Sequence, residues 1–168
     1  MANILSIHCS VLNGFGRLGI LIITEEAEII TNIFQSPSIF SFKRDVGEIL
    51  NWHKDNILSL ISNYNIDSIV VKKTETISIR GKNSDVFKLY LEGVMLSLAG
   101  SLGIQNSHFG KNSIKAILKN TKIYDLSLEE ILESFEIKLD SFPTNNDSRE
   151  VIKEVLLAAI AFNIYLQE

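Results

Sequence analysis

Basic side chains gather in the middle third of this 168-residue chain, while the segments on either side are acidic. From Lys72 to Lys122 the sequence holds nine basic residues against three acidic ones. An exposed surface of one sign attracts polyanions from a distance, so this stretch predicts a surface for phosphate groups. The residues expected to contact phosphate are Lys72, Lys73, Arg80, Lys82, Lys111, Lys115 and Lys119.

The spacing of three of these lysines is typical of one helical face. Lys111, Lys115 and Lys119 recur every four residues, and no acidic residue lies between Lys111 and Lys122 to pair with them. A solvated helix face without a partner is the alternative interpretation, because runs of charge are only hypotheses about partners.

Histidine and cysteine offer a second kind of chemistry, which the spacing does not favour. His8 and Cys9 are adjacent in a predicted strand, so their side chains point to opposite faces and cannot form a nucleophilic dyad. His53 and His108 lie far from each other in the sequence and do not form the compact ligand pattern of a zinc site.

The composition predicts one compact domain over residues 1–168, because 46% of the residues are hydrophobic. The apolar runs are too short to span a bilayer, and the N-terminus has no signal-peptide pattern. A single cysteine excludes an intrachain disulfide, which is typical of a reducing compartment. We therefore expect a soluble cytoplasmic protein without a membrane partner.

The elements that must position the charged side chains follow from hydrophobic periodicity. Three strands at residues 4–8, 18–24 and 27–34 predict an antiparallel meander, with a hairpin turn at Asn13-Gly14-Phe15-Gly16. Two further strands at 66–71 and 104–109 alternate with helices. The helices are expected at 45–64, 85–102, 111–118, 127–136 and 147–165.

This order, three meandering strands followed by two crossover units, predicts an α/β fold. The sheet is mixed and five-stranded, with a three-strand antiparallel meander, two parallel strands, and helices on both faces. The pattern resembles the ribonuclease H-like superfamily, and in detail its RuvC-type Holliday-junction resolvase branch. The segments that carry the resemblance are Val70-Val71-Lys72-Lys73, Lys82-Asn83-Ser84, Glu92-Gly93-Val94 and Asn112-Ser113-Ile114-Lys115-Ala116.

The resemblance implies a nuclease that holds two divalent metal ions with acidic residues. These acids end the first and fourth strands and begin the last helix. Several carboxylates are needed because two such ions repel each other. This sequence departs from the pattern, since His8 stands at the first position and Lys72, or Lys73 in a shifted register, at the second.

The last helix departs less from the pattern. Glu150 and Glu154 are four residues apart and share a face, although the implied spacing is three, which falls on Lys153. Glu75 replaces the missing strand acid only if its loop folds back.

Three functions remain open at this point. The first is a catalytically inactive domain, without metal or cofactor, that binds nucleic acid or a nucleoprotein partner through its basic residues. The second is an active endonuclease that uses Mg²⁺ or Mn²⁺ with Glu75, Glu150 and Glu154. The third is an interaction or scaffolding domain, in which the acidic run 129–136 meets the basic surface, either within the chain or in a second copy in a homodimer.

Overall fold

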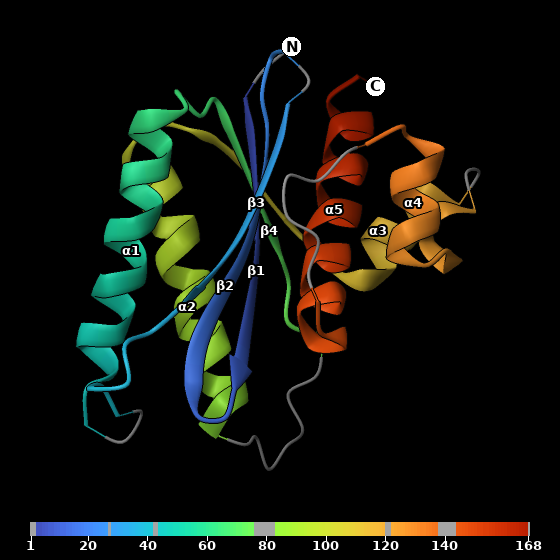
Figure 1. The fold of residues 1–168 in the computed structure, drawn as a ribbon. Helices are drawn as coiled ribbons and strands as arrows, with labels where there is room; N and C mark the ends of the chain where they lie inside the picture. Colours follow the sequence, from blue (N-terminus) through green and yellow to red (C-terminus); the bar gives the residue numbers. More distant parts are fainter. Residues whose placement is uncertain are drawn as a thin grey trace.

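The computed structural model describes residues 3–26, 28–41, 44–75, 83–119, 122–137 and 144–167, which form a five-stranded mixed sheet covered by helices (Figure 1). The strand order is β3-β2-β1-β4-β5, so β1 is central. The strands are β1 (Ile4–Leu12), β2 (Phe15–Ile23), β3 (Ile29–Gln35), β4 (Ser68–Lys72) and β5 (Gln105–Phe109). This arrangement confirms the predicted meander followed by two parallel strands.

The hairpin between β1 and β2 is tighter than the sequence predicts. β1 does not end at His8 but continues to Leu12, which pairs with Phe15 across the hairpin. Asn13 and Gly14 form the two-residue loop with φ of 51° and 80°, as a type I′ turn requires. The expectation that β1 ends at His8 is therefore wrong, because β2 begins early enough to pair with four further residues of β1.

The strand register places Gly19, His8 and Lys72 side by side in one row across the sheet. His8 of β1 pairs with Gly19 of β2 on one side and with Lys72 of β4 on the other. β4 is parallel to β1 and buried at every position, so Lys72 ends a fully covered strand. His8 and Lys72, which the resemblance places at the first and second acid positions, are thus neighbours across the sheet.

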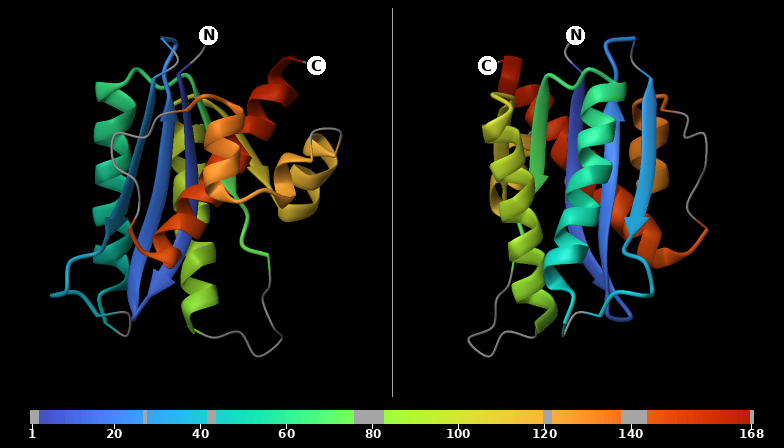
Figure 2. Two further views of the ribbon diagram at one scale, coloured as in Figure 1. Left: turned by 45° about the vertical axis from the view of Figure 1, so that its right-hand side comes forward. Right: turned by 90° about the vertical axis from the view of Figure 1, so that its left-hand side faces the viewer.

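The helices lie on both faces of the sheet, as predicted. Helices α1 (Val46–Asn63) and α2 (Asn83–Ser101) cover one face (Figures 1 and 2). The other face carries α3 (Lys111–Leu118), α4 (Leu128–Ser134) and α5 (Asn146–Gln167), with a short 3-10 helix between α3 and α4. None of the helices in the described ranges is long and apolar enough to cross a membrane.

Helix α5 is the main support of the second face, and its first turns lie close to β2. Val151 occupies the space beside Gly19, since a Cβ atom on Gly19 would lie 2.1 Å from Val151 Cγ1. Asp147 forms an ion pair with the buried Arg17 of β2. The glycine and the ion pair together bring the start of α5 down onto the sheet beside β1 and β4.

Candidate functional site

A pocket of about 480 Å³ opens where the end of β4, the second half of β1 and the first turns of α2 and α5 meet. Its lining includes His8 and Ser10 of β1 as well as Thr74 after β4. The charged residues that line it are Lys72, Glu75, Asp85, Lys88, Asp147, Glu150 and Glu154. Five carboxylates and two ammonium groups give the lining an acidic balance, which the basic composition of the middle segment did not predict.

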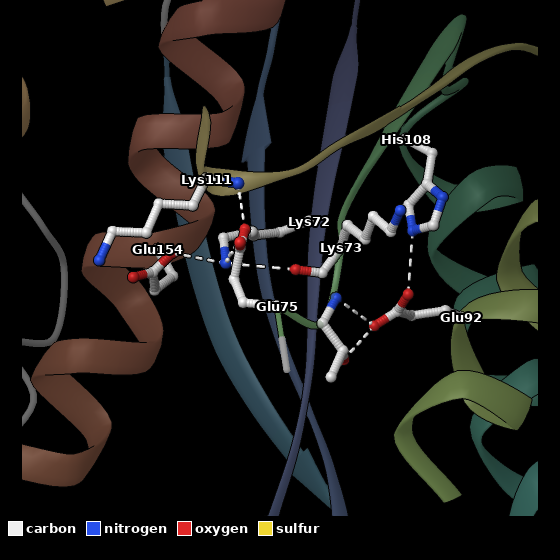
Figure 3. Close-up of polar contacts among 8 residues, drawn as sticks. Lys72, Lys73, Glu75, Glu92, His108, Lys111 and Glu154 are labelled. Atoms are coloured by element: carbon white, nitrogen blue, oxygen red, sulfur yellow. Dashed lines mark hydrogen bonds and ion pairs between the residues drawn. The ribbon is translucent and has the colours of Figure 1, made fainter. Parts of the chain in front are cut away.

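Lys72 lies at the base of this pocket, and its charge is neutralised from two sides. The residue is 5% exposed, and its Nζ lies 3.2 Å from Glu154 Oε2 and 3.5 Å from Glu75 Oε1 (Figure 3). Nζ also donates a hydrogen bond to the carbonyl oxygen of Lys73 at 3.3 Å. This arrangement leaves little of the ammonium charge for an external phosphate, so the predicted phosphate contact of Lys72 gains no support from it.

Glu75 contacts Lys72 because the loop after β4 folds back toward the sheet. The sequence predicted a role for Glu75 only if this loop folds back. Besides its ion pair with Lys72, Glu75 Oε1 accepts a hydrogen bond from the backbone N–H of Lys111 (Figure 3). That N–H belongs to the first turn of α3, where the helix dipole favours a negative charge. One carboxylate therefore joins β4 to α3.

His8 stands beside Lys72 as a neutral imidazole. Burial, and then the positive charges of Lys72, Lys88 and Arg17, lower the pKa of His8 to about 3. Its Nδ1 atom is buried and has no hydrogen-bond partner among the described residues. His8 is thus uncharged near neutral pH.

Glu150 and Glu154 line the same pocket from α5, one helical turn apart. Glu150 is exposed, whereas Glu154 is half-buried and contacts Lys72. Glu154 Oε2 accepts no hydrogen bond of good geometry from the described residues. Its contact with the Lys72 ammonium is therefore an ion pair without a well-aligned hydrogen bond.

These residues do not fit a pair of divalent metal ions. Nowhere in the described ranges do three His, Cys, Asp or Glu side chains come close enough to hold one metal ion. An ammonium group instead lies between Glu75 and Glu154, and it would repel a divalent cation.

A buried glutamate on α2 organises the neighbouring loop, and the sequence analysis missed its role. Glu92 is 2% exposed, and its Oε1 accepts hydrogen bonds from the backbone N–H of Thr74, at 2.7 Å, and from the Thr74 hydroxyl. Its Oε2 lies 2.9 Å from Nε2 of His108 at the end of β5 (Figure 3). The signals in the sequence are an acidic residue within a largely apolar helix and the segment Glu92-Gly93-Val94, which carried the resemblance without a role for the carboxylate.

The predicted lysine row lies on α3, beside this pocket. Lys111, Lys115 and Lys119 are exposed, and no carboxylate in the described ranges forms an ion pair with them. Lys115 Nζ lies 4.7 Å from the centre of the Tyr124 ring. Burial, and then the negative charges of Glu154, Glu75 and Asp125, raise the pKa of that tyrosine to about 12.

Of the other three predicted basic residues, the structure describes one. Lys73 is exposed directly after β4, so it is accessible beside the row. Arg80 and Lys82 lie outside the described residues.

Comparison with solved structures identifies this architecture. RuvC of Thermus thermophilus in complex with a Holliday junction substrate superimposes with a TM-score of 0.68 at 13% identity, covering 99% of this chain and 96% of that one. The chain has the RuvC-type ribonuclease H-like fold. A second structure of Thermus thermophilus RuvC gives a TM-score of 0.63 at 12% identity, over 98% of this chain and 95% of that one.

The RuvC-type likeness extends to a mitochondrial protein. The yeast mitochondrial Holliday junction resolvase Ydc2 gives a TM-score of 0.60 at 11% identity, covering 98% of this chain and 78% of that chain. Sequence comparison finds no matching family model and no similar curated protein. Structural similarity at such low sequence identity establishes the fold alone, and the function depends on the residues of the site.

Proposed function

We propose that this chain is a catalytically inactive RuvC-like domain that binds nucleic acid, or a nucleoprotein, through the basic surface of α3. The observation that carries the proposal is the contrast at one edge of the sheet. Lys111, Lys115 and Lys119 are exposed and unneutralised within the described ranges, whereas Lys72 is fixed between two carboxylates in the pocket beside them.

Binding without cleavage follows from the chemistry of the pocket. Hydrolysis by this type of site needs a metal ion that activates water, and an ammonium group cannot supply that activation. The acidic lining also opposes the close approach of a phosphate. We therefore expect the nucleic acid to follow α3 rather than enter the pocket.

A branched DNA is the first ligand to test, because one solved structure with this fold is a complex with a Holliday junction substrate. Fluorescence anisotropy should compare a four-way junction, a duplex and a single strand over a range of salt concentrations. On duplex DNA each phosphate contact contributes about −0.9 to the slope of log K against log salt.

Matched variants locate the binding surface. The double variant Lys115→Ala/Lys119→Ala should weaken binding and make the slope shallower by about two units. The control is Arg44→Ala/Lys54→Ala, which removes the same charge beside and on α1, the helix on the other face. Equal losses in the two variants, or no binding at low salt, would overturn the proposed surface.

Cleavage is tested separately with the same DNAs in Mg²⁺ or Mn²⁺. We expect no products above the level of a heat-inactivated sample. Cleavage that Glu150→Gln abolishes would instead establish the active endonuclease that uses Glu75, Glu150 and Glu154.

Pairing with a second copy is a second candidate function, favoured by the exposed acidic face of α4. Glu133 and Glu136 are exposed and form no ion pair with a described residue, although Glu129 pairs with Arg149 at 2.9 Å. This face is complementary in charge to the lysine row on α3. Size-exclusion chromatography with light scattering should then show a dimer that dissociates at high salt.

A further inference from the structure

Three aromatic side chains form a cluster where α5 passes the end of β5. Phe109, the last residue of β5, contacts the ring of Phe162 with centroids 6.0 Å apart and the ring of Tyr165 with centroids 5.7 Å apart. Both contacts are edge-to-face, with interplanar angles of 69° and 85°. Aromatic pairs favour this geometry, so the cluster fixes the position of the Tyr165 ring.

The outer member of this cluster is open to solvent. Phe162 is fully buried, whereas Tyr165 is 52% exposed near the end of α5. The ring of Phe109 covers at most one face of the Tyr165 ring, so a flat aromatic surface remains accessible. A ring that its neighbours already hold in place loses little conformational freedom when it binds a flat ligand.

The position of Tyr165 links it to the lysine row on α3. Phe109 contacts Tyr165 and lies two residues before Lys111, which begins α3. Helix α3 itself packs against α5 (Figure 1). The lysine row therefore begins beside the aromatic cluster, and it forms no ion pair with a carboxylate in the described ranges.

The aromatic cluster is separate from the acidic pocket. Tyr165 follows Glu154 by eleven residues in α5, which corresponds to about 16 Å along the helix axis. The carboxylates that oppose the approach of a phosphate line the pocket, around the first turns of that helix. A ligand that contacts Tyr165 and α3 therefore avoids most of this negative charge.

We propose that Tyr165 stacks against an unpaired base of a single-stranded nucleic acid whose phosphates lie along the lysine row of α3. Every base has a flat π face, so stacking on this ring requires no particular sequence. Bases within a duplex already stack on each other and leave no free face along its length. The inference deepens the proposed function, on which it rests for the phosphate contacts, and names unpaired segments as the preferred ligand.

The experiment measures, by fluorescence anisotropy, the affinity of oligothymidylate and of a duplex for the unaltered protein and for Tyr165→Leu. Leucine keeps an apolar contact with Phe109 but has no ring face. The variant should bind the single strand about tenfold more weakly and the duplex equally well, because one stacking contact is lost. The slope of log K against log salt should not change, because every phosphate contact remains.

Two control variants separate the ring from a general effect of apolar surface. Tyr90→Leu removes a tyrosine of similar exposure, 55%, from α2 on the other face of the sheet, and it should not change binding. Tyr165→Phe keeps the ring and should bind the single strand as the unaltered protein does. The same series with oligouridylate distinguishes RNA from DNA as the source of the base.

A second measurement requires no variant. A fluorescent base analogue whose emission is quenched by stacking should lose fluorescence when a single strand that carries it binds the unaltered protein. Tyr165→Leu, at a concentration that saturates the strand, should quench the analogue less.

Two results would overturn the inference. One is a folded Tyr165→Leu protein that binds the single strand as tightly as Tyr90→Leu, and the other is an analogue that stays unquenched on the unaltered protein. If Lys115→Ala/Lys119→Ala still weakens binding in that case, the proposed function stands and only the stacking fails. An unaltered protein that binds neither duplex nor single strand at low salt overturns both.

Discussion

The pocket and helix α3 present the same residue type in opposite environments. Lys72 is 5% exposed and touches two carboxylates, while Lys115 on α3 is exposed and contacts an aromatic ring. The buried lysine holds elements of this fold together, whereas the exposed one is available to a partner. A count of charges along the sequence therefore does not distinguish a buried structural lysine from an exposed one.

The largest effect on stability should come from the buried lysine. Lys72→Met leaves Glu75 and Glu154 without their cation and should lower the free energy of unfolding by about 3 kcal/mol. This is at the lower end of the range for buried pairs, because both carboxylates keep partial contact with water. Urea unfolding at neutral pH measures the loss. A change below about 0.5 kcal/mol would show that the pair resembles a surface ion pair.

His8 should make the same region sensitive to acid. Its pKa is about 3 in the folded protein and near the ordinary 6.5 in the unfolded chain, so between these values the unfolded chain binds more protons. Stability is therefore complete above about pH 6.5 and is lost as the pH falls, by about 2 kcal/mol between pH 6.5 and pH 4.5.

Urea unfolding across that pH range, on the unaltered protein and on His8→Asn, measures this loss. The variant should lose less stability on acidification. Part of the loss should remain in the variant, because burial also lowers the pKa of His53, to about 4, so that His53 also destabilises the fold in acid. Identical pH profiles for the two proteins would contradict the neutral, buried His8.

The hydrogen-bond network of Glu92 should contribute a smaller amount. Glu92→Gln weakens the bonds to Thr74 and His108 and should cost about 1–2 kcal/mol in the free energy of unfolding. The matched control is Glu48→Gln at an exposed position of α1, which should change stability by no more than about 0.5 kcal/mol. Equal changes in the free energy of unfolding for the two substitutions would show that the hydrogen bonds of Glu92 do not stabilise the pocket.

The exposed lysines should give the smallest effect on stability. Lys111→Ala and Lys119→Ala should each change the free energy of unfolding by no more than about 0.5 kcal/mol, because neither forms an ion pair in the described ranges. The same variants should weaken nucleic-acid binding. A loss of stability as large as that of Lys72→Met would abolish the contrast between the two regions.

Much of the fold was predictable, because it depends on local patterns. Alternating and continuous apolar runs predicted five strands, and the resemblance placed His8 and Lys72 at the ends of the first and fourth strands, which pair in the sheet. The extent of β1 was not predictable from its own residues. Pairing with β2 extends that strand beyond the apolar stretch.

The candidate site was less predictable, because its contacts join distant segments. Glu75 was identified only on condition that its loop folds back, and the bond to Lys111 that satisfies this condition spans 36 residues. Glu92 was noted only as part of the segment Glu92-Gly93-Val94, and its hydrogen bond to Thr74 at one side of the pocket was not predicted. Exposure of the α3 lysines followed from spacing, whereas the burial of Lys72 required the packing of α5.

Gly19 gives this chain a packing constraint that lies outside the charged residues. It occupies the same row of the sheet as His8 and Lys72, and Val151 of α5 fills the place of its missing side chain. A Cβ atom on Gly19 would lie 2.1 Å from Val151 Cγ1, so a change from glycine to alanine requires Val151 or the helix that carries it to shift. The packing of the helix that carries Glu154 thus depends on an uncharged position two strands away from Lys72.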